Sequence, residues 1–288
     1  MTFTPEIYQG DFFQLWPERI TAGTVDLILA DPPYSLFTDE KKLRYNLPNE
    51  SRIDLELLER IYDKILQPTG QVLIYANFDL MQRICYTFGR LLEFRFCHII
   101  AKNHGMPSNK YNPITTHEFL LRFAKRGVKV SDLTFNPRES GKSGATFQKR
   151  NYNPDCSTRR IKKSPVNHSD PNGKRWITSV LQSESRCTLP KAERSLSSNP
   201  FQKSERLCRI LIRVYSDPGS LIVDSFAGSG TTLAAAHLEG RRSIGFEIKE
   251  KYFLEARQRI NTAVNQLPLL SSGLSEIPLF PEAIEREA

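Results

Sequence analysis

The amino-acid sequence predicts an α/β fold with a mostly parallel sheet and helices on both faces. Two observations support this prediction. Short apolar runs, typical of buried strands, alternate along the chain with longer segments in which apolar residues recur every three or four positions. The same alternation resumes after a long basic segment in the middle of the chain. Such a pattern is typical of parallel strands that are joined by crossover helices.

The first half of the chain supplies four strands and two helices in this scheme. The expected strands are TVDLILAD (24–31), QVLIYAN (71–77), FRFCHIIAKN (94–103) and HEFLLRFAK (117–125). The expected helices are DLELLERIYDKI (54–65), which the following Leu-Gln-Pro-Thr-Gly should stop by residue 70, and LMQRICYTFGRLL (80–92).

The second half repeats the pattern with two strands and three helices. The expected strands are SLIVDSF (220–226) and RSIGFEI (242–248). The expected helices are ERLCRILIRVYSD (205–217), TTLAAAHLEG (231–240) and EKYFLEARQRINTAV (250–264). Residues 266–288 are expected to form a loosely attached tail.

Composition places the chain among ordinary globular proteins. It has 288 residues, of which 39% are hydrophobic and 25% are charged, and it has no apolar stretch of the roughly 20 residues that span a membrane. The N-terminus lacks an export signal, so we expect a cytoplasmic protein. The five cysteines include no C-x-x-C pair, and no two of the five histidines have metal-ligand spacing, so neither a disulfide framework nor a metal site is expected.

The positive charge is concentrated in one segment. Between Lys125 and Lys203 there are 17 Lys or Arg and 6 Asp or Glu, a balance of +11, so the rest of the chain carries −3 of the net +8. This Ser-, Asn-, Gly- and Pro-rich segment reads either as a solvated face or as a surface that contacts nucleic-acid phosphates. The candidate phosphate contacts are Lys149, Arg150, Arg159, Arg160, Lys162, Lys163, Lys174 and Arg175.

The first strand ends in Asp31-Pro32-Pro33-Tyr34. Adjacent prolines donate no backbone hydrogen bond and restrict φ, so they stop the strand and stiffen the chain. Asp31 and Tyr34 are thereby held at the end of a strand. Taken alone, the tetrapeptide could equally be a loop with a capping aspartate.

A second strand runs into a glycine turn at VDSFAGSGTT (223–232). The turn opens a helix and brings backbone N–H groups close to any ligand at the strand end. It is neither a Walker A loop nor a G-x-G-x-x-G fingerprint. The next strand ends near Glu247, whose carboxylate can accept two ribose hydroxyls or can simply cap the following helix.

Together these motifs resemble the β-class of S-adenosylmethionine-dependent DNA amino-methyltransferases. In that family DPPY comes first, a target-recognition region follows, and an F-x-G-x-G cofactor loop comes last, which is the order found here. NPFQKSERL (199–207) resembles the family segment H-P-T-Q-K-P/S-x-x-L, although Asn199 replaces the usual His and Phe201 the usual Thr. Residues 101–125 resemble the segment that lines the base pocket.

The resemblance implies a Rossmann-like methyltransferase fold with a seven-stranded sheet and a small, loop-rich, basic target-recognition region. It divides the chain into a catalytic half (1–125), the target-recognition region (126–198), a cofactor-binding half of the same domain (199–265) and the tail (266–288). The implied catalytic residues are Asp31, Pro32, Pro33 and Tyr34. The implied cofactor-binding residues are Asp11, Lys203, Asp224, Phe226, Gly228, Gly230, Thr231, Thr232 and Glu247, although the Gly-Asp at Asp11 could be a plain turn.

The implied reaction explains DPPY chemically. An exocyclic amino nitrogen is a poor nucleophile because its lone pair is delocalised into the ring. Acceptors for both N–H bonds, the Asp31 carboxylate and the Pro32 carbonyl, can draw it toward tetrahedral geometry, while Tyr34 stacks on the base. The amine lies inside a base pair, so double-stranded DNA must present it by base flipping.

The resemblance favours adenine N6 over cytosine N4, because DPPY begins with Asp rather than Ser. Cytosine C5 is not expected, since no cysteine follows a proline. An RNA amino-methyltransferase, a non-catalytic nucleic-acid binder and a nucleotide oxidoreductase are weaker alternatives. A homodimer and a cognate restriction endonuclease are left open as further partners.

Overall fold

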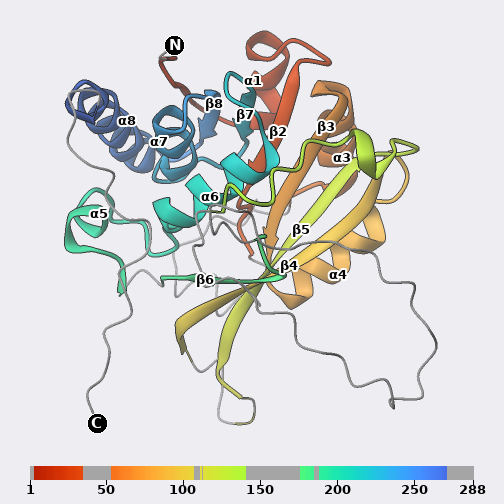
Figure 1. Ribbon diagram of the computed structural model, residues 1–288, viewed down its shortest axis with the longest axis horizontal. Coiled ribbons are helices and arrows are strands. Elements are labelled where there is room, and N and C mark those ends of the chain that lie inside the picture. The colour runs from red at the N-terminus through yellow and green to blue at the C-terminus, as the bar shows by residue number, and fades with distance from the viewer. Residues whose placement is uncertain are drawn as a thin grey trace, which may run out of the picture.

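The computed structural model describes residues 3–34, 53–106, 111, 113–140, 176–184 and 188–270, and its strands form one twisted sheet (Figure 1). The order of the strands across the sheet is β1-β8-β7-β2-β3-β5-β4-β6. Their bounds are β1 Glu6–Gln9, β2 Val25–Ala30, β3 Leu66–Ala76, β4 Leu92–Met106, β5 Thr115–Lys125, β6 Val180–Ser183, β7 Leu221–Asp224 and β8 Arg242–Glu247.

The helices lie on both faces of the sheet, as the sequence predicts. Their bounds are α1 Phe12–Arg19, α3 Leu55–Ile65, α4 Phe78–Thr87, α5 Lys191–Ser195, α6 Glu205–Tyr215, α7 Thr231–Leu238 and α8 Glu250–Leu270, with a short 3-10 turn at Val130–Asp132. The predicted α/β fold is thus confirmed. Helix α8 continues to residue 270, five residues into the segment that the sequence assigns to the tail.

The described sheet has eight strands rather than the expected seven. The four residues of β6 lie within the segment expected to be a loop-rich recognition region, and they pair in parallel with β4, Ile99 opposite Val180. A run as short as Val-Leu-Gln-Ser has too little periodicity to be recognised as a strand from sequence.

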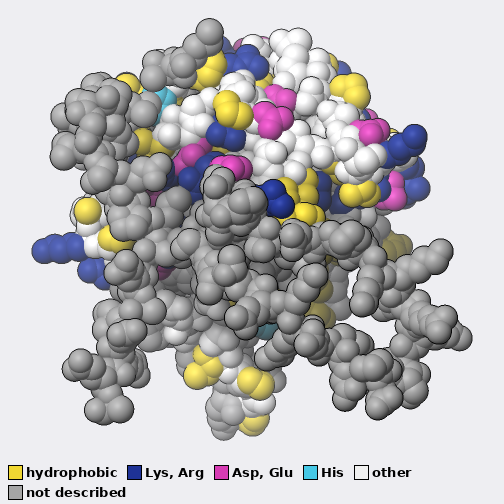
Figure 2. Space-filling model, in the orientation of Figure 1, with side chains coloured by type: hydrophobic (Ala, Val, Ile, Leu, Met, Phe, Trp, Pro, Cys, Tyr) yellow, Lys and Arg dark blue, Asp and Glu magenta, His cyan; other side chains and the backbone are white. Residues whose placement is uncertain are grey.

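The expectation of parallel strands is wrong for β4 and β5. They form an antiparallel hairpin, and β5 is also antiparallel to β3. Only residues 107–114 separate the two strands, whereas a parallel crossover needs a dozen or more residues. Figure 2 shows hydrophobic side chains gathered at the lower end of the view, where Figure 1 places the far end of this hairpin.

The first predicted helix ends at Ile65, as expected, but the Pro-Thr-Gly segment expected to stop it lies in a strand. Helix α3 ends at Ile65, and Pro68, Thr69 and Gly70 lie inside β3. A Cβ atom on Gly70 would come within 2.6 Å of the Val25 carbonyl oxygen. The glycine therefore permits close approach of β2 and β3, whose register shifts between Val25 and Leu27.

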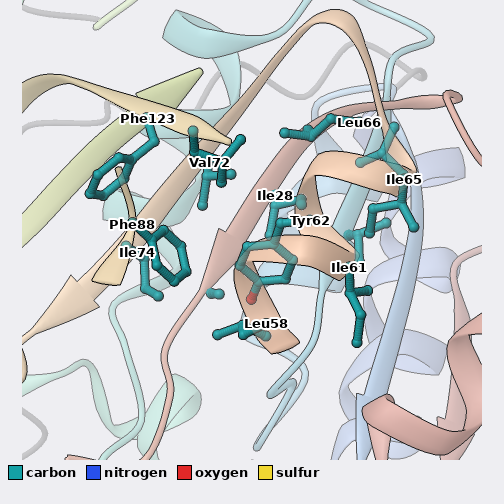
Figure 3. Packing of buried hydrophobic residues seen from close by; sticks show 14 of the residues in the cluster. Ile28, Leu58, Ile61, Tyr62, Ile65, Leu66, Val72, Ile74, Phe88 and Phe123 are labelled. Carbon is teal, nitrogen blue, oxygen red and sulfur yellow. The ribbon is translucent and has the colours of Figure 1, made fainter. Parts of the chain in front are cut away.

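Strand β2 is buried on both faces, which explains its unbroken apolar run. Ile28 packs with α3 residues such as Leu58 and Tyr62 on one face (Figure 3). Leu27 and Leu29 pack on the other face with α6 residues such as Leu211. Full burial of each such side chain stabilises the fold by about 1.5–3 kcal/mol.

Asp26 fixes the register of three strands at the edge of the sheet where β2 begins. Its Oδ1 accepts a hydrogen bond from the Gln67 side chain, and its Oδ2 accepts one from the Leu221 backbone N–H, both at 2.7 Å. Because β3 and β7 are both bonded to the Asp26 carboxylate, the carboxyl ends of β3 and β7 are aligned with the carboxyl end of β2.

In the described part of the chain, no helix is long and apolar enough to cross a membrane.

Candidate active site

The ends of β2 and β7 lie side by side. The two strands are parallel neighbours, with Leu27 opposite Ile222 and Ile28 opposite Val223. DPPY follows β2 and the glycine turn follows β7, so both motifs emerge at the same carboxyl edge of the sheet. The two motifs are almost 200 residues apart in the sequence and are neighbours in the fold.

DPPY leaves the sheet immediately after Ala30. Pro32 is buried, while Pro33 is exposed. The side chain of Asp31 keeps 23% of its surface exposed, and its Oδ1 lies 3.1 Å from Nζ of Lys203. This brings together three residues that the sequence singles out, Asp31, Tyr34 and Lys203, because the Lys203 ammonium also donates to the Tyr34 hydroxyl at 3.1 Å.

Lys203 lies in this charged cluster, beside Asp31 and Tyr34, and has no described contact with the glycine turn. Its ammonium donates to both Oε1 and Oε2 of Glu118, each at 3.1 Å. It also lies over the ring of Tyr75, 4.5 Å from the centroid. The ion pair with Asp31 is close, but it is not aligned as a hydrogen bond, and Asp31 Oδ1 is buried without a hydrogen-bond donor.

Sequence reasoning missed Glu118 and Lys102. Glu118 lies on β5 and is only 3% exposed, and it accepts hydrogen bonds from Lys102 at 2.9 Å and from the Tyr34 hydroxyl at 3.1 Å. The available signal was a lone acidic residue at the start of the apolar run of strand 117–125. That signal gives no partner, because the pairing with Lys203 spans 85 residues.

Charges in the cluster shift one another's protonation. Burial raises the pKa of Asp31; the Lys203 ammonium opposes this effect and the Glu118 carboxylate adds to it. Burial would also raise the pKa of Glu118, but the Lys203 and Lys102 ammonium groups overcome it and lower the pKa to about 2. Burial would lower the pKa of Lys203, but Asp31 and Glu118 raise it. Glu118 and Lys203 are therefore both ionised at neutral pH.

The glycine turn after β7 depends on backbone conformations that favour glycine. Gly228 has φ +51° and Gly230 has φ +74°. A Cβ atom on Gly230 would lie 2.8 Å from the Cβ of Ala256 in α8, and one on Gly228 would lie 3.0 Å from Nδ2 of Asn199. The carbonyl of Ser229 accepts a hydrogen bond from the buried Arg259 at 2.9 Å. Helix α8 thus packs against the turn and holds it in place through Ala256 and Arg259.

Two carboxylates flank the turn. Asp224, at the end of β7, accepts the Phe226 N–H at 3.0 Å, and burial raises its pKa to about 7. Glu247, at the end of β8, accepts the Gly228 N–H at 2.9 Å and the Lys249 N–H at 2.8 Å, and burial raises its pKa. Glu247 therefore holds the turn and also caps the entry to α8. A carboxylate can accept about four hydrogen bonds, so Glu247 keeps acceptor capacity for a ligand.

The other predicted cofactor residues surround this turn. Asp11 caps α1 by accepting the Phe13 N–H at 3.0 Å, next to the bond from Gly10 N–H to the Glu247 carbonyl. Thr231 and Thr232 are buried in the first turn of α7, where the Thr231 hydroxyl lies 3.0 Å from that of Ser229. The eight basic residues predicted to contact phosphates, from Lys149 to Arg175, lie outside the described residues.

The fit of this edge to a nucleoside-bearing methyl donor and an amine that receives the methyl group rests on three features. Glycines leave room beside backbone N–H groups, Glu247 presents free acceptor positions, and Asp31 Oδ1 is a buried acceptor without a donor. Among the described residues, no group of three His, Cys, Asp or Glu side chains could hold a metal ion.

Comparison with solved structures supports the same fold. The M1.HpyAVI–SAM complex matches with a TM-score of 0.58 and 22% identity, covering 89% of this chain and 98% of the other. The cytosine-N4-specific PvuII DNA methyltransferase matches with a TM-score of 0.59 and 17% identity, covering 93% of each chain.

Sequence relatives cover most of the chain. Type II methyltransferase M.HinfI of Haemophilus influenzae is 27% identical over 93% of this chain and 72% of its own length. DNA adenine methyltransferase YhdJ of Escherichia coli is 27% identical over 85% of this chain and 79% of its own. The family model N6_N4_Mtase, described as DNA methylase, matches residues 25–258, which include both strand-end motifs and the charged cluster. The chain therefore belongs to the N6/N4 DNA methylase family.

Proposed function

We propose that this protein is a site-specific DNA methyltransferase that transfers a methyl group from S-adenosylmethionine to the exocyclic N6 of adenine. The observation that carries the proposal is the adjacency of DPPY and the glycine turn at one edge of the sheet, on the neighbouring strands β2 and β7. An acceptor amine held at Asp31 and a donor held by the turn would then lie within reach of each other.

Each DPPY residue has a role in this reaction. Oδ1 of Asp31 accepts one amino N–H of the flipped base, and the Pro32 carbonyl accepts the other. The ring of Tyr34 stacks on the base. With both N–H bonds engaged, the nitrogen lone pair turns toward the methyl carbon, and the new N–C bond forms as the C–S bond breaks. The nitrogen then loses a proton, and Asp31 is positioned to accept it.

The bound cofactor supplies an electrophilic methyl group on a sulfonium sulfur, which keeps the bonding electron pair when the methyl leaves. Glu247 would accept the ribose hydroxyls, and the turn from Phe226 to Gly230, whose glycines leave room for it, would approach the rest of the donor. Asp224, Thr231 and Thr232 hold the turn in shape, and Asp11 holds the neighbouring loop. Two similar solved structures, of M1.HpyAVI and TTHA0409, contain S-adenosylmethionine, which supports this cofactor.

Adenine is favoured over cytosine by Asp31, the first residue of DPPY. The relative YhdJ is named an adenine methyltransferase, which supports the same choice. The likeness to the cytosine-N4-specific PvuII enzyme, at 17% identity, concerns the fold alone. Cytosine N4 remains the second candidate because the amine chemistry is shared by the two bases.

The substrate is double-stranded DNA, from which the target must be rotated at an unstacking cost of a few kcal/mol. Phosphate contacts from the basic region 126–198 would offset that cost. In keeping with the composition, we place the enzyme in the cytoplasm. Pairing with a cognate restriction endonuclease and assembly as a homodimer belong to the same proposal.

One experiment tests the reaction directly. The protein is incubated with methyl-labelled S-adenosylmethionine and plasmid DNA from a host without DNA methylases, and the DNA is then digested to nucleosides. Label in N6-methyldeoxyadenosine is expected. Label in N4-methyldeoxycytidine would transfer the proposal to the second candidate, and the absence of labelled DNA would overturn it.

A further inference from the structure

The hydrogen bonds of the Lys203 ammonium are directed away from Asp31. They go to Oε1 and Oε2 of Glu118 and to the Tyr34 hydroxyl, all at 3.1 Å. Asp31 Oδ1 is equally near, at 3.1 Å, but no donor is well aligned with it. The Lys203 ammonium therefore lies against two carboxylates and aligns its hydrogen bonds with only one of them, Glu118.

We propose that Glu118 is a positioning residue: it engages the Lys203 ammonium so that Asp31 Oδ1 stays open for the amino group of the target base. This inference rests on the proposed function, and it assigns a role to a residue on β5 that belongs to neither strand-end motif. Glu118 acts through Lys203 and has no described contact with the reacting atoms.

The surroundings of Glu118 suit this role. It is almost fully buried, and Lys102 donates to its Oε2 at 2.9 Å, so it is held in place from a second side. Lys102 and Lys203 together keep it ionised, which their lowering of its pKa to about 2 reflects. A neutral amide at this position would still accept a hydrogen bond from the ammonium, but it would lack the attraction between opposite charges that a buried carboxylate supplies.

Neutralising Glu118 should redirect Lys203. The ammonium has three protons, and Asp31 would then be its only carboxylate partner among the described residues. A lysine bonded to Asp31 Oδ1 competes with the target amine for that acceptor. The expected defect is therefore slow methyl transfer with intact cofactor binding, and it should depend on the presence of Lys203.

The pH dependence gives an independent signature. The charged and titratable groups that face Asp31 are Lys203, Glu118, Tyr34, Tyr75 and Asp224, with Lys102 on the far side of Glu118. The negative charge of Glu118 raises the pKa of Asp31, and the positive charge of Lys203 lowers it. Glu118→Gln removes the first effect and keeps the second, so the pKa of Asp31 should fall. The acidic limb of the rate profile should therefore move to lower pH. Lys203→Met should move it to higher pH.

The experiment compares wild type, Glu118→Gln, Lys203→Met and the double variant. Single-turnover methylation is measured with enzyme in excess over the plasmid DNA described above, and S-adenosylmethionine affinity is measured by calorimetry. Glu59→Gln serves as the matched control. Glu59 is also a buried carboxylate, but its Oε1 accepts backbone N–H groups of Gly89, Leu91 and Leu92, and it has no described contact with Asp31 or Lys203.

We expect Glu118→Gln to slow single turnover by about tenfold or more in the wild-type background and by less than about twofold in the Lys203→Met background. Equal losses in the two backgrounds, or lost cofactor affinity, would overturn the inference. If Lys203→Met shows no measurable turnover, the acidic limb of Glu118→Gln decides: a shift to lower pH supports the inference and an unmoved limb refutes it. Glu59→Gln should move neither the limb nor the rate. An inactive wild type would instead refute the proposed function.

Discussion

The ends of β2 and β7 lie side by side, yet different means hold them in shape. After β2, two prolines stiffen the backbone, and an ion cluster of Asp31, Lys203 and Glu118 fixes the side chains. After β7, glycines allow the turn, and carboxylates fix its backbone N–H groups, as Asp224 does for Phe226 and Glu247 for Gly228.

The difference matches what each edge would bind in the proposed reaction. A small amine needs a few acceptor atoms at fixed points, which charged side chains provide. A cofactor with several polar groups needs space and backbone donors, which glycines provide. The first edge should therefore be sensitive to changes of charge, and the second to changes of volume. The following predictions test that contrast, from the largest effect to the smallest.

Asp31→Ala should have the largest effect, because it removes the acceptor at the reacting nitrogen. We expect single-turnover methylation to fall by about 10³-fold, the size typical of losing one preorganised electrostatic contact. Cofactor affinity, measured by calorimetry, should change little, because the glycine turn belongs to the neighbouring strand. A variant with near-normal turnover would falsify the assignment of Asp31.

Gly230→Ala should damage the second edge through volume alone. The new Cβ would meet Ala256 at 2.8 Å and would also sit at φ +74°. Gly240→Ala is the matched control, since Gly240 has a similar φ of +72° but a Cβ atom added there would meet no other atom within 4 Å. We expect a loss of unfolding free energy of roughly 1–2 kcal/mol for the control and about 1–3 kcal/mol more for Gly230→Ala. Urea unfolding measures both. Only Gly230→Ala should also weaken cofactor binding, and equal behaviour of the two variants would contradict the contrast.

Two variants of Tyr34 separate the contribution of its ring from that of its hydroxyl. Base stacking on an aromatic side chain is worth about 1–3 kcal/mol, so Tyr34→Ala should raise the KM for DNA by roughly tenfold or more. Tyr34→Phe keeps the ring and loses the hydroxyl, with its bonds to Lys203 and Glu118. It should have the smaller effect on KM in steady-state assays. Equal increases in the two variants would mean that the hydroxyl, rather than the ring, is what the substrate needs.

Asp224→Asn should change how stability depends on pH. Burial raises the pKa of Asp224 from 3.8 to about 7, so the folded state keeps a proton that the unfolded state releases. The stability gained from this proton is complete at acidic pH and is lost as pH rises through 7. The unfolding free energy of the variant should therefore rise relative to that of wild type between pH 5 and pH 8, by about 2–3 kcal/mol in urea unfolding. The same difference at both pH values would show that Asp224 titrates normally.

The sequence predicts the elements and the two strand-end motifs because both are local features. The apolar run of β2 and the helical periodicity of α3 are visible in a window of a few residues, and Pro32-Pro33 and Gly228-Ser229-Gly230 mark where strands end. Which edge each motif faces followed from the rule that parallel strands share a carboxyl edge.

The contacts of Glu118 and the strand β6 could not be predicted in this way. Glu118 meets Lys203 only because β5 turns back antiparallel to β3, and this direction depends on the short link from β4. Strand β6 depends on the free edge of β4, which no local pattern records. Long-range register decides both, and periodicity carries no information about it.

The hydrogen bond from the Leu221 N–H to Asp26 joins positions 195 apart in the chain. During synthesis on the ribosome, β2 must therefore wait for β7, 195 positions later, before this neighbour arrives. A product that ends before β7 would carry DPPY without the neighbouring glycine turn, so in the proposed reaction it could not methylate DNA.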